Sequence, residues 1–458
     1  MRLFGTNGIR EVVGDKLTAA FITRVAGAIG ATFPVGDPIA VGRDGRTSSP
    51  AITRLVEGTL ALAGHRVIDV GILPTPAIQY LVPRLGAQLG VIVTASHNPP
   101  EFNGLKCIAA DGLEVERSVE EAIEEGAEKG VARTVPFASV GAIQSVSDGA
   151  HRYTEGILAQ VDLERVRQRR FTVVLDCGNG ASVETSPHLL RRLGCRVITL
   201  NGHLDGTFPG HPSEPTEANT RDAQRTVPAL GADLGVIHDG DADRAVFVDH
   251  TGRYVPGEEI LALLARDAVE RAHGGVVVSP VSASQSLEDT VVPLGGSVVY
   301  TRVGSPAVAH AMVEQHAVLG GEENGGIITP RFQVARDGGM TAASVLDLMA
   351  RKERSLADLL AGLPRYSLVK EKVECPSELR TRVVSSVGEA FRKAGQRVVT
   401  IDGVKAFRDG GWVLLRPSGT EPLLRLFAEA KDPASARRFA DESLAAVRQA
   451  IAEAKGAA

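Results

Sequence analysis

Short apolar runs alternate with longer amphipathic stretches over most of the chain. The run at residues 89–93, LGVIV, contains no polar position and is typical of a buried strand. The stretches 52–63 and 260–272 instead repeat apolar residues at helical spacing. Strands that alternate with helices in this way predict layered α/β domains with parallel or mixed sheets.

Two strand patterns recur three times in the same order. The first pattern stands at residues 64–71, 194–201 and 295–302. The second pattern ends at residues 93, 238 and, more weakly, 321. Chance recurrence of valine, isoleucine and glycine explains any single pair, but three ordered copies favour true repeats. We therefore expect three similar mixed-sheet α/β domains.

The last part of the chain has a different pattern. It begins with a polar stretch at 370–378, which we interpret as a linker, and predicts strands near 397–401 and 411–416. A final helix has Leu444, Val447 and Ile451 on one face. This part predicts a smaller α+β domain. The expected domains are residues 1–150, 151–252, 253–364 and 365–458.

Composition argues against several classes of protein. Acidic residues outnumber basic ones, 55 to 50, which argues against nucleic acid as the main partner. No run of 18 apolar residues is present, so we expect no membrane span. The start, MRLFGTNGIR, has no apolar core of signal-peptide length. The four cysteines form no C-x-x-C pair and are too few for a disulfide framework, which predicts a cytoplasmic location.

The loop after the run 89–93 presents chemically useful side chains. TASHNPPEFNGLK, residues 94–106, places Ser96 and His97 just beyond the strand, and Lys106 ten residues after Ser96. A hydroxyl at the end of a buried strand is a common position for a reacting group in α/β proteins. Ordinary turn chemistry explains Ser-His-Asn-Pro equally well when it is taken alone.

Three aspartates alternate in HDGDADR. Asp239, Asp241 and Asp243 can converge on one hard cation from a tight loop. An EF-hand is excluded because Arg244 and His250 stand where glycine and glutamate are required. Oxygen ligands without paired histidine or cysteine favour Mg²⁺ over Zn²⁺. A loop without metal is disfavoured because crowded like charges need neutralisation.

Two further loops suit a phosphorylated sugar. In GGEENGG, residues 320–326, Glu322 and Asn324 can bond vicinal hydroxyls, although an ordinary surface turn has the same composition. RPSGTEPLLR, residues 416–425, can aim backbone N–H groups, hydroxyls and guanidinium groups at one anion. A plain turn is the weaker alternative there, because arginines stand at both ends. Near the start of the chain, Arg10 could face a phosphate, whereas Arg43 and Arg46 could equally be structural ion-pair partners.

With these loops in this order, the chain resembles the α-D-phosphohexomutase superfamily over essentially its full length. The matching motifs are TASHNP at 94–99, DGDADR at 239–244, GEENG at 321–325 and SGTEP at 418–422. The opening FGTNGIR and the GEENGG loop look closest to archaeal phosphoglucosamine mutases and phosphomannomutase/phosphoglucomutases. The chain departs from many members at Glu11, Ser305 and Gly326, where glycine, an acid or histidine, and histidine are frequent.

The resemblance implies a fold and an activity. Three α/β domains carry the phosphoserine, metal and sugar loops, and a C-terminal α+β phosphate-binding domain completes a central cleft. Phosphorylated Ser96 would exchange its phosphoryl group with a hexose phosphate, so that 1- and 6-phosphates interconvert through a hexose 1,6-bisphosphate, which also primes the enzyme. Phosphoglucosamine mutase is the leading assignment, with phosphomannomutase/phosphoglucomutase as the alternative.

The resemblance also implies roles for residues. The catalytic set is Ser96, His97, Arg10, Arg244 and Lys106, with Lys106 as general acid/base. One Mg²⁺ per chain would be held by Asp239, Asp241, Asp243 and an oxygen of phosphorylated Ser96. The substrate would be bound by Glu322, Asn324, Arg416, Ser418, Gly419, Thr420 and Arg425. A phosphoserine phosphatase and a non-catalytic sugar-phosphate sensor are less favoured, and a homodimer or larger homo-oligomer stays open.

Overall fold

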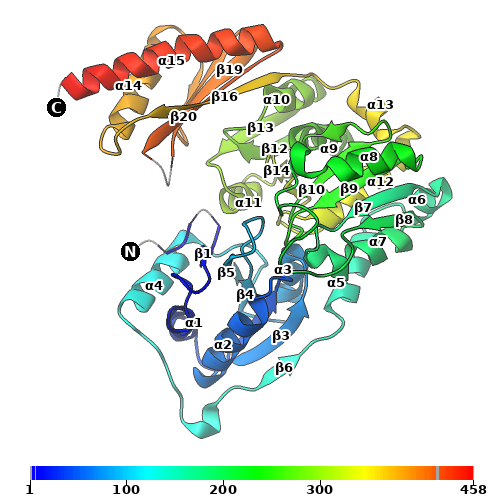
Figure 1. Cartoon of the computed structure of the whole chain (residues 1–458), viewed down its shortest axis with the longest axis vertical. Helices are drawn as coiled ribbons and strands as arrows, with labels where there is room; N and C mark the ends of the chain where they lie inside the picture. Colours follow the sequence, from blue (N-terminus) through cyan, green and yellow to red (C-terminus); the bar gives the residue numbers. More distant parts are fainter. Residues whose placement is uncertain (1–2, 6, 419–421, 457–458) are drawn as a thin grey trace.

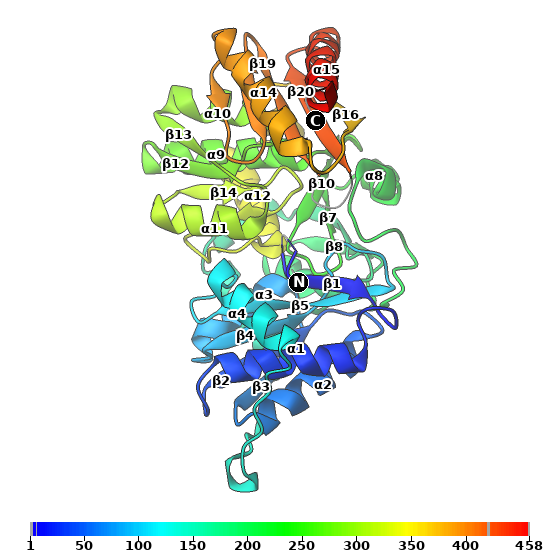
Figure 2. The ribbon, with the colours of Figure 1, turned by 90° about the vertical axis from the view of Figure 1, so that its left-hand side faces the viewer.

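The computed structural model describes residues 3–5, 7–418 and 422–456, folded into four units (Figure 1). Three units pack helices against a mixed sheet, and the fourth carries an antiparallel sheet. The view in Figure 2 places the fourth unit beside the third, at the end of the molecule away from the first. Among the described helices, none combines the length and apolar character needed to cross a bilayer.

Domain I contains a six-stranded sheet in the order β1-β5-β4-β2-β3-β6. The pairs of β2 with β3 and β4, and of β3 with β6, are parallel, whereas β5 is antiparallel to both neighbours. Its elements are β1 (Ile9–Val12), α1 (Ala19–Thr32), β2 (Pro38–Arg43), α2 (Ser49–Leu62), β3 (Arg66–Ile72), α3 (Thr75–Arg84), β4 (Leu89–Val93), β5 (Phe102–Ala109), α4 (Arg117–Glu128) and β6 (Ile143–Ser145).

Domain II has the sheet order β11-β10-β9-β7-β8. Its elements are α5 (Gly149–Leu158), α6 (Leu163–Arg169), β7 (Thr172–Asp176), α7 (Ser186–Arg192), β8 (Arg196–Leu200), α8 (Arg221–Ala229), β9 (Leu234–His238), β10 (Ala245–Asp249) and β11 (Tyr254–Val255). The predicted boundaries stay predictions, although β11 joins this sheet from beyond residue 252.

Domain III has the sheet order β13-β12-β14-β15. Its elements are α9 (Gly257–Ala272), β12 (Gly275–Pro280), α10 (Gln285–Val291), β13 (Gly296–Thr301), α11 (Ser305–Glu314), β14 (Leu319–Gly321), β15 (Ile327–Ile328), α12 (Gly338–Lys352) and α13 (Leu356–Leu360). Helix α12 is buried from Gly338 to Ala350, because its sequence has apolar or small residues on nearly every side.

The repeated strand patterns occupy equivalent positions in the three sheets. Central strands β2, β7 and β12 each pair in parallel with two neighbours. One neighbour carries the first pattern (β3, β8 and β13), and the other carries the second (β4, β9 and β14). The internal repeat inferred from sequence is therefore present in the fold, and it puts the loops after β4, β9 and β14 at corresponding edges.

Domain IV has the sheet order β16-β20-β19-β18-β17. Its elements are β16 (Ser367–Glu374), α14 (Arg380–Lys393), β17 (Val398–Val399), β18 (Val404–Arg408), β19 (Gly411–Pro417), β20 (Leu423–Ala430) and α15 (Pro433–Gly456). The prediction of a linker at 370–378 is wrong for residues 370–374, because these residues belong to β16 and pair with β20. Charged residues alternate with Val369 and Val373 along this half-buried edge strand, and we misread that alternation as a polar segment.

The cores divide the molecule unequally. One large apolar cluster runs through domains I, II and III and surrounds α9 and α12. Domain IV has its own core between its sheet and helices α14 and α15. A small cluster of Val281 with Trp412 and Leu414 joins domain IV to domain III.

Candidate active site

Ser96 lies in a strained and fully buried turn just beyond strand β4. Its φ of 52° is in the left-handed region, which L-residues rarely adopt without support. The hydroxyl of Thr94 supports the turn by accepting a hydrogen bond from the Ser96 N–H at 2.9 Å. The Ser96 hydroxyl donates to Oδ2 of Asp239, 3.2 Å away. The first two predicted loops therefore meet at this hydroxyl.

Arg46 fixes the shape of the serine loop. Its buried guanidinium donates to four backbone carbonyl oxygens, those of Ser96, Asn98, Pro99 and Phe102, at 2.6 to 2.9 Å. Its Nε–H donates to Asp44 at 3.1 Å. Because all these donors face the loop from within, Arg46 is a structural residue, which resolves one alternative that the sequence left open.

The three aspartates of the second loop converge as predicted. One carboxylate oxygen from each of Asp239, Asp241 and Asp243 lies within 4.8 Å of the others, and all three side chains are buried. In the described structure Oδ1 of Asp241 and Oδ1 of Asp243 are buried without a hydrogen-bond partner. Burial, followed by the charges of its two neighbours, raises the pKa of Asp239 well above its ordinary value. Unpartnered carboxylate oxygens under mutual repulsion fit a hard divalent cation such as Mg²⁺.

Lys106 reaches the same loop from strand β5. Its register partner is Ile92 on β4, so the lysine lies beside the strand that ends at the serine loop. Its Nζ is 3.1 Å from Oδ2 of Asp241 and 3.7 Å from Oδ2 of Asp243, and the side chain is buried. This ammonium group offsets part of the aspartates' negative charge and brings a titratable proton to the centre.

Arg244 and His97 form one wall of the site. Arg244 donates to Glu214 at 2.6 Å and to Nδ1 of His97 at 3.0 Å. Burial and the nearby charges of Arg244 and Arg10 lower the pKa of His97 to about 3. His97 is therefore neutral at physiological pH, and with Nδ1 as acceptor its Nε2–H remains as the donor.

Arg10 completes the charged wall from strand β1. Its guanidinium donates to the amide oxygen of Asn98 at 3.1 Å. Burial lowers the pKa of Arg10, although Asp241 and Asp243 oppose that shift. A cleft of about 740 Å³ opens over this wall, and its lining includes Arg10, His97, Arg244, Glu322, Asn324 and Arg336.

The sugar loop is held by a residue that the sequence analysis missed. Arg336 is buried and pairs with Glu322 through Nη1 and with Asp243 through Nη2. A Cβ on Gly326 would lie 2.3 Å from Cδ of Arg336, so the glycine leaves room for the arginine stem. The sequence offers one local hint of Arg336, which is its position directly before a helix cap. Asp337 caps helix α12 by accepting a hydrogen bond from the N–H of Met340.

Two further hydrogen bonds fix the rest of the sugar loop. Oε1 of Glu322 accepts from the N–H of Gly304 at 3.1 Å, and Oδ1 of Asn324 accepts from the N–H of Gly326 at 3.1 Å. Both side chains line the cleft. Glu322 thus accepts from two protein partners, Arg336 and Gly304.

A chain of hydrogen bonds through Ser305 links domain I to domain III. Ser305, at the start of α11, accepts from the Asn7 amide at 2.8 Å and donates to Glu114 at 3.1 Å. Burial raises the pKa of Glu114. Ser305 and Asn7 both line the cleft. The departure from the family pattern at position 305 therefore lies in the site, in an interdomain hydrogen-bond chain.

The predicted phosphate residues form a separate cluster on domain IV. Arg416 and Arg425 are register partners on β19 and β20. Arg416 pairs with Asp402 at 2.6 Å, and Oδ2 of Asp402 also accepts from Val303 N of domain III at 3.1 Å. The N–H of Ser418 donates to Leu423 O at 3.0 Å. Gly419 and Thr420 lie outside the described residues. Within the described lining of the cleft, none of these domain IV residues appears.

Comparison with known proteins gives a consistent assignment. Models of phosphoglucomutase/phosphomannomutase domains match most of the chain in order: α/β/α domain I at 1–133, domain II at 151–252, domain III at 256–366 and the C-terminal domain at 369–446. A phosphoglucomutase/phosphomannomutase of Thermococcus kodakarensis is 38% identical, covering 98% of this chain and 99% of its own. A probable phosphoglucosamine mutase of Methanopyrus kandleri is 40% identical and covers 99% of both chains.

A solved structure gives the same result for the fold. The phosphoglucomutase/phosphomannomutase family protein of Burkholderia thailandensis superposes with a TM-score of 0.87 at 28% identity, covering 98% of this chain and 97% of its own. The predicted arrangement of α/β domains with mixed sheets is thereby confirmed. The chain belongs to the phosphoglucomutase/phosphomannomutase family, within the α-D-phosphohexomutase superfamily.

Proposed function

We propose that this protein interconverts the 1-phosphate and 6-phosphate of a hexose through a phosphorylated Ser96, with glucosamine phosphate as the preferred substrate. The chain is a phosphohexomutase and hence an isomerase of the intramolecular phosphotransferase kind. The observation that carries the residue-level proposal is the buried Ser96 hydroxyl, 3.2 Å from Asp239 and beside the cluster of Asp241 with Lys106.

Each half-reaction moves one phosphoryl group. The bond between phosphorus and Ser96 Oγ breaks while a bond to the free sugar hydroxyl forms. The hydroxyl proton passes to Lys106 Nζ, which must be deprotonated at that moment, and returns in the reverse transfer. Arg10, Arg244 and the Nε2–H of His97 would stabilise the charge that spreads over the phosphoryl oxygens.

The three aspartates would hold one Mg²⁺ together with an oxygen of phosphorylated Ser96. When bound, this ion supplies positive charge against the transferring phosphoryl group. Support comes from the oxygen-only ligand set and from the two unpartnered carboxylate oxygens of Asp241 and Asp243. The chain's own contribution is to keep these oxygens buried and close together before substrate arrives.

With one reactive serine and one distal phosphate site, the bisphosphate intermediate has to reorient between the two transfers. Glu322 and Asn324 would bind sugar hydroxyls, while the non-reacting phosphate would be held by Arg416, Ser418, Gly419, Thr420 and Arg425. After the first transfer, the hexose 1,6-bisphosphate would exchange its two phosphates between the sites. The same bisphosphate would prime Ser96 of unphosphorylated protein.

Substrate choice is tested by coupled assays of glucosamine, glucose and mannose phosphates in both directions. We expect the highest kcat/KM for glucosamine phosphate, as the names of several relatives suggest, including the phosphoglucosamine/phosphogalactosamine mutase of Sulfurisphaera tokodaii, 38% identical over 96% of this chain. A higher value for glucose or mannose phosphate would favour the phosphomannomutase/phosphoglucomutase alternative. Release of inorganic phosphate without isomerisation would instead indicate a phosphatase.

We further propose a cytoplasmic location, supported by four buried cysteines that are all free thiols. A homodimer or larger homo-oligomer remains a prediction, and light scattering of the purified chain would measure the assembly directly.

A further inference from the structure

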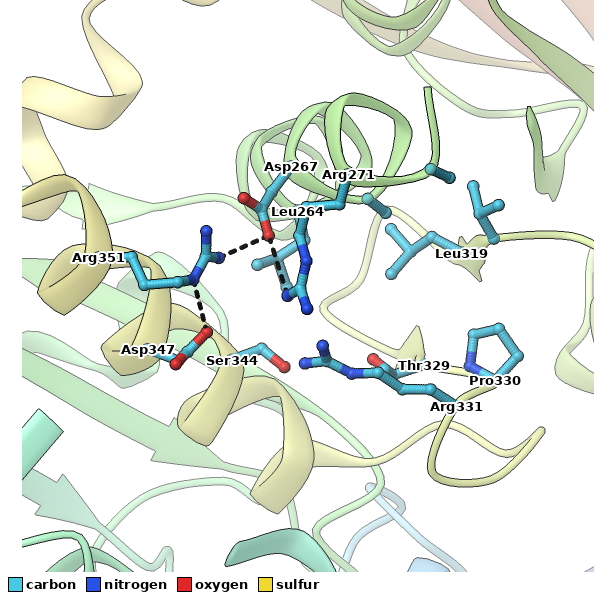
Figure 3. A pocket seen from close by; sticks show the side chains of 13 residues that line it. Leu264, Asp267, Arg271, Leu319, Thr329, Pro330, Arg331, Ser344, Asp347 and Arg351 are labelled. Carbon is cyan, nitrogen blue, oxygen red and sulfur yellow. Dashed lines mark hydrogen bonds and ion pairs between the residues drawn. The ribbon is translucent and has the colours of Figure 1, made fainter. Parts of the chain in front are cut away.

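A second cavity lies in domain III, between helices α9 and α12 (Figure 3). Its volume is about 380 Å³, and it shares no lining residue with the catalytic cleft. Leu264, Leu319 and Pro330 contribute to its apolar wall. The mutase reaction described above assigns no role to this cavity.

Three arginines reach the cavity from three different elements. Arg271 comes from α9, Arg351 from α12, and Arg331 from the loop after β15. Arg351 is paired with both carboxylates of the cavity. Its Nη2 donates to Oδ2 of Asp267 at 2.7 Å, and its Nε donates to Oδ2 of Asp347 at 2.9 Å. Arg271 has only a long contact of 3.9 Å to that same oxygen of Asp267. The two carboxylates are therefore largely used by one arginine.

Arg331 is the exposed arginine of the cavity that makes no direct hydrogen bond or ion pair within the described structure. Its guanidinium faces that of Arg271 across the opening (Figure 3). Burial and the charge of Arg271 lower the pKa of Arg331, and the carboxylates of Asp347 and Asp267 offset part of that shift. Two guanidinium groups that face each other over an apolar wall repel, and an anion between them would relieve that repulsion.

Two buried polar atoms in the cavity lining also lack partners. Oγ of Ser344 and Oδ1 of Asp267 are inaccessible to solvent and make no hydrogen bond within the described structure. Ser344 is only 7% exposed and lines the cavity from α12. Both residues line the cavity, where a ligand with hydrogen-bonding groups would supply the partners that these two atoms lack.

We propose that this cavity binds a small organic phosphate monoester that carries a hydroxyl group and an apolar face. The phosphate would lie between Arg271 and Arg331, because its several oxygens can accept from two guanidinium groups at once. The hydroxyl would hydrogen-bond the Oγ of Ser344 and the carboxylate of Asp267, whose Oδ1 has to turn toward the ligand. The apolar face would pack on Leu264 and Leu319. The proposal is independent of the mutase activity, since no residue is shared between the two sites.

Calorimetric titration with 4-hydroxyphenyl phosphate tests this proposal, because the probe has a phosphate, a ring and a hydroxyl. We expect saturable binding to the wild-type chain, weakened at least about tenfold in Arg331→Met and in Arg271→Met through loss of a charge-assisted hydrogen bond. Arg438→Met removes an exposed arginine elsewhere and should bind the probe as the wild type does. Ser344→Ala should weaken binding less, by about threefold.

Two further arms identify the site and the ligand class. Arg416→Met tests whether the probe goes to the domain IV phosphate loop, and we expect unchanged binding there. Hydroquinone and 4-hydroxybenzoate replace the phosphate with no charge and with a carboxylate, and both should bind at least about fivefold more weakly. Absence of probe binding, equal affinity in Arg331→Met, loss of binding in Arg416→Met, or equal affinity for the carboxylate would each overturn the proposal.

Thermal unfolding separates a binding defect from a folding defect. The probe should raise the Tm of the wild type and leave that of Arg331→Met nearly unchanged, since only a ligand bound to the native state stabilises it. Without the probe, Arg331→Met should unfold at the wild-type temperature or above it, because the substitution removes like-charge repulsion with Arg271. A lower Tm without the probe would mean that the attraction of Arg331 to Asp267 and Asp347 outweighs its repulsion by Arg271, and would contradict the proposal.

Discussion

The reacting centre and the distal phosphate site are built differently. Ser96, Lys106 and the three aspartates are buried, mutually bonded and enclosed by elements of domains I and II. The phosphate residues of domain IV belong to a separate core, and Arg416 is about one-fifth exposed and paired with Asp402. This difference supports our proposal that the chemical centre is organised before substrate arrives, whereas the arginine of the proposed phosphate site exchanges partners on binding.

The junction of domains III and IV is nevertheless specific. Nζ of Lys405 donates to Ala283 O at 2.9 Å, and Glu429 accepts from Gln285 N at 2.7 Å, both across the junction and both buried. Burial lowers the pKa of Lys405 to about 7. The interface therefore combines buried charged groups with the apolar contact of Val281, Trp412 and Leu414.

Ser96→Ala should have the largest effect and gives the clearest contrast with domain IV. Removing the phosphoryl carrier should lower kcat at least about ten-thousandfold, as for other nucleophiles that form covalent intermediates. Ser418→Ala, the matched change on the distal loop, should raise KM by about threefold with kcat nearly kept. Coupled assays of both variants would measure kcat and KM. A similar loss of kcat in both variants would contradict the proposed difference between the two sites.

Asp241→Asn should come next. Losing one of three metal-facing carboxylates should lower activity about a thousandfold, because the ion supplies several kcal/mol of charge stabilisation. Treatment of the wild type with EDTA should have the same result and be reversed by Mg²⁺. The Tm of Asp241→Asn should fall only slightly even though activity is largely lost, because the substitution relieves repulsion with Asp239 and Asp243. Full activity after EDTA treatment would exclude a metal role.

Arg336→Met tests whether the pre-organised centre includes the sugar loop. The substitution removes the link between Asp243 and Glu322, and the resulting misplacement should lower kcat/KM by about a hundredfold. Gly326→Ala should produce a similar defect, because its Cβ would displace the arginine stem. Gly58→Ala, at a helical glycine with open space around it, is the control that should change nothing. Normal kinetics in both site variants would place Arg336 outside the mechanism.

Arg416→Ala should act mainly on binding. Loss of one charge-assisted contact to the non-reacting phosphate should raise KM about tenfold, with a smaller fall in kcat because that phosphate also orients the reacting hydroxyl. Asp402→Asn, which releases Arg416 from its ion pair while keeping an acceptor for Val303 N, should change KM by no more than about threefold. Steady-state kinetics of both variants would show whether Arg416 leaves Asp402 to bind the non-reacting phosphate. An unchanged KM in Arg416→Ala would refute a role of Arg416 in binding that phosphate.

The sequence predicted the centre better than its surroundings, for physical reasons. Ser96 and the three aspartates lie in short loops directly after apolar strands, so local pattern was enough to find them. Arg336 acts through Asp243, 93 residues away in the chain, and no local spacing reveals such a contact. Strand β16 was misread because an edge strand with one exposed face alternates charged and apolar residues much as a polar linker does.

The central claim is that Ser96 carries the phosphoryl group. The most direct measurement is the intact mass of protein incubated with hexose 1,6-bisphosphate, followed by fragmentation to locate the modification. We predict one added phosphoryl group per chain, located on Ser96, which disappears when an excess of hexose 6-phosphate is added with Mg²⁺ and is absent in Ser96→Ala. A catalytically competent protein whose mass never changes, or whose phosphate lies on another residue, would contradict this account.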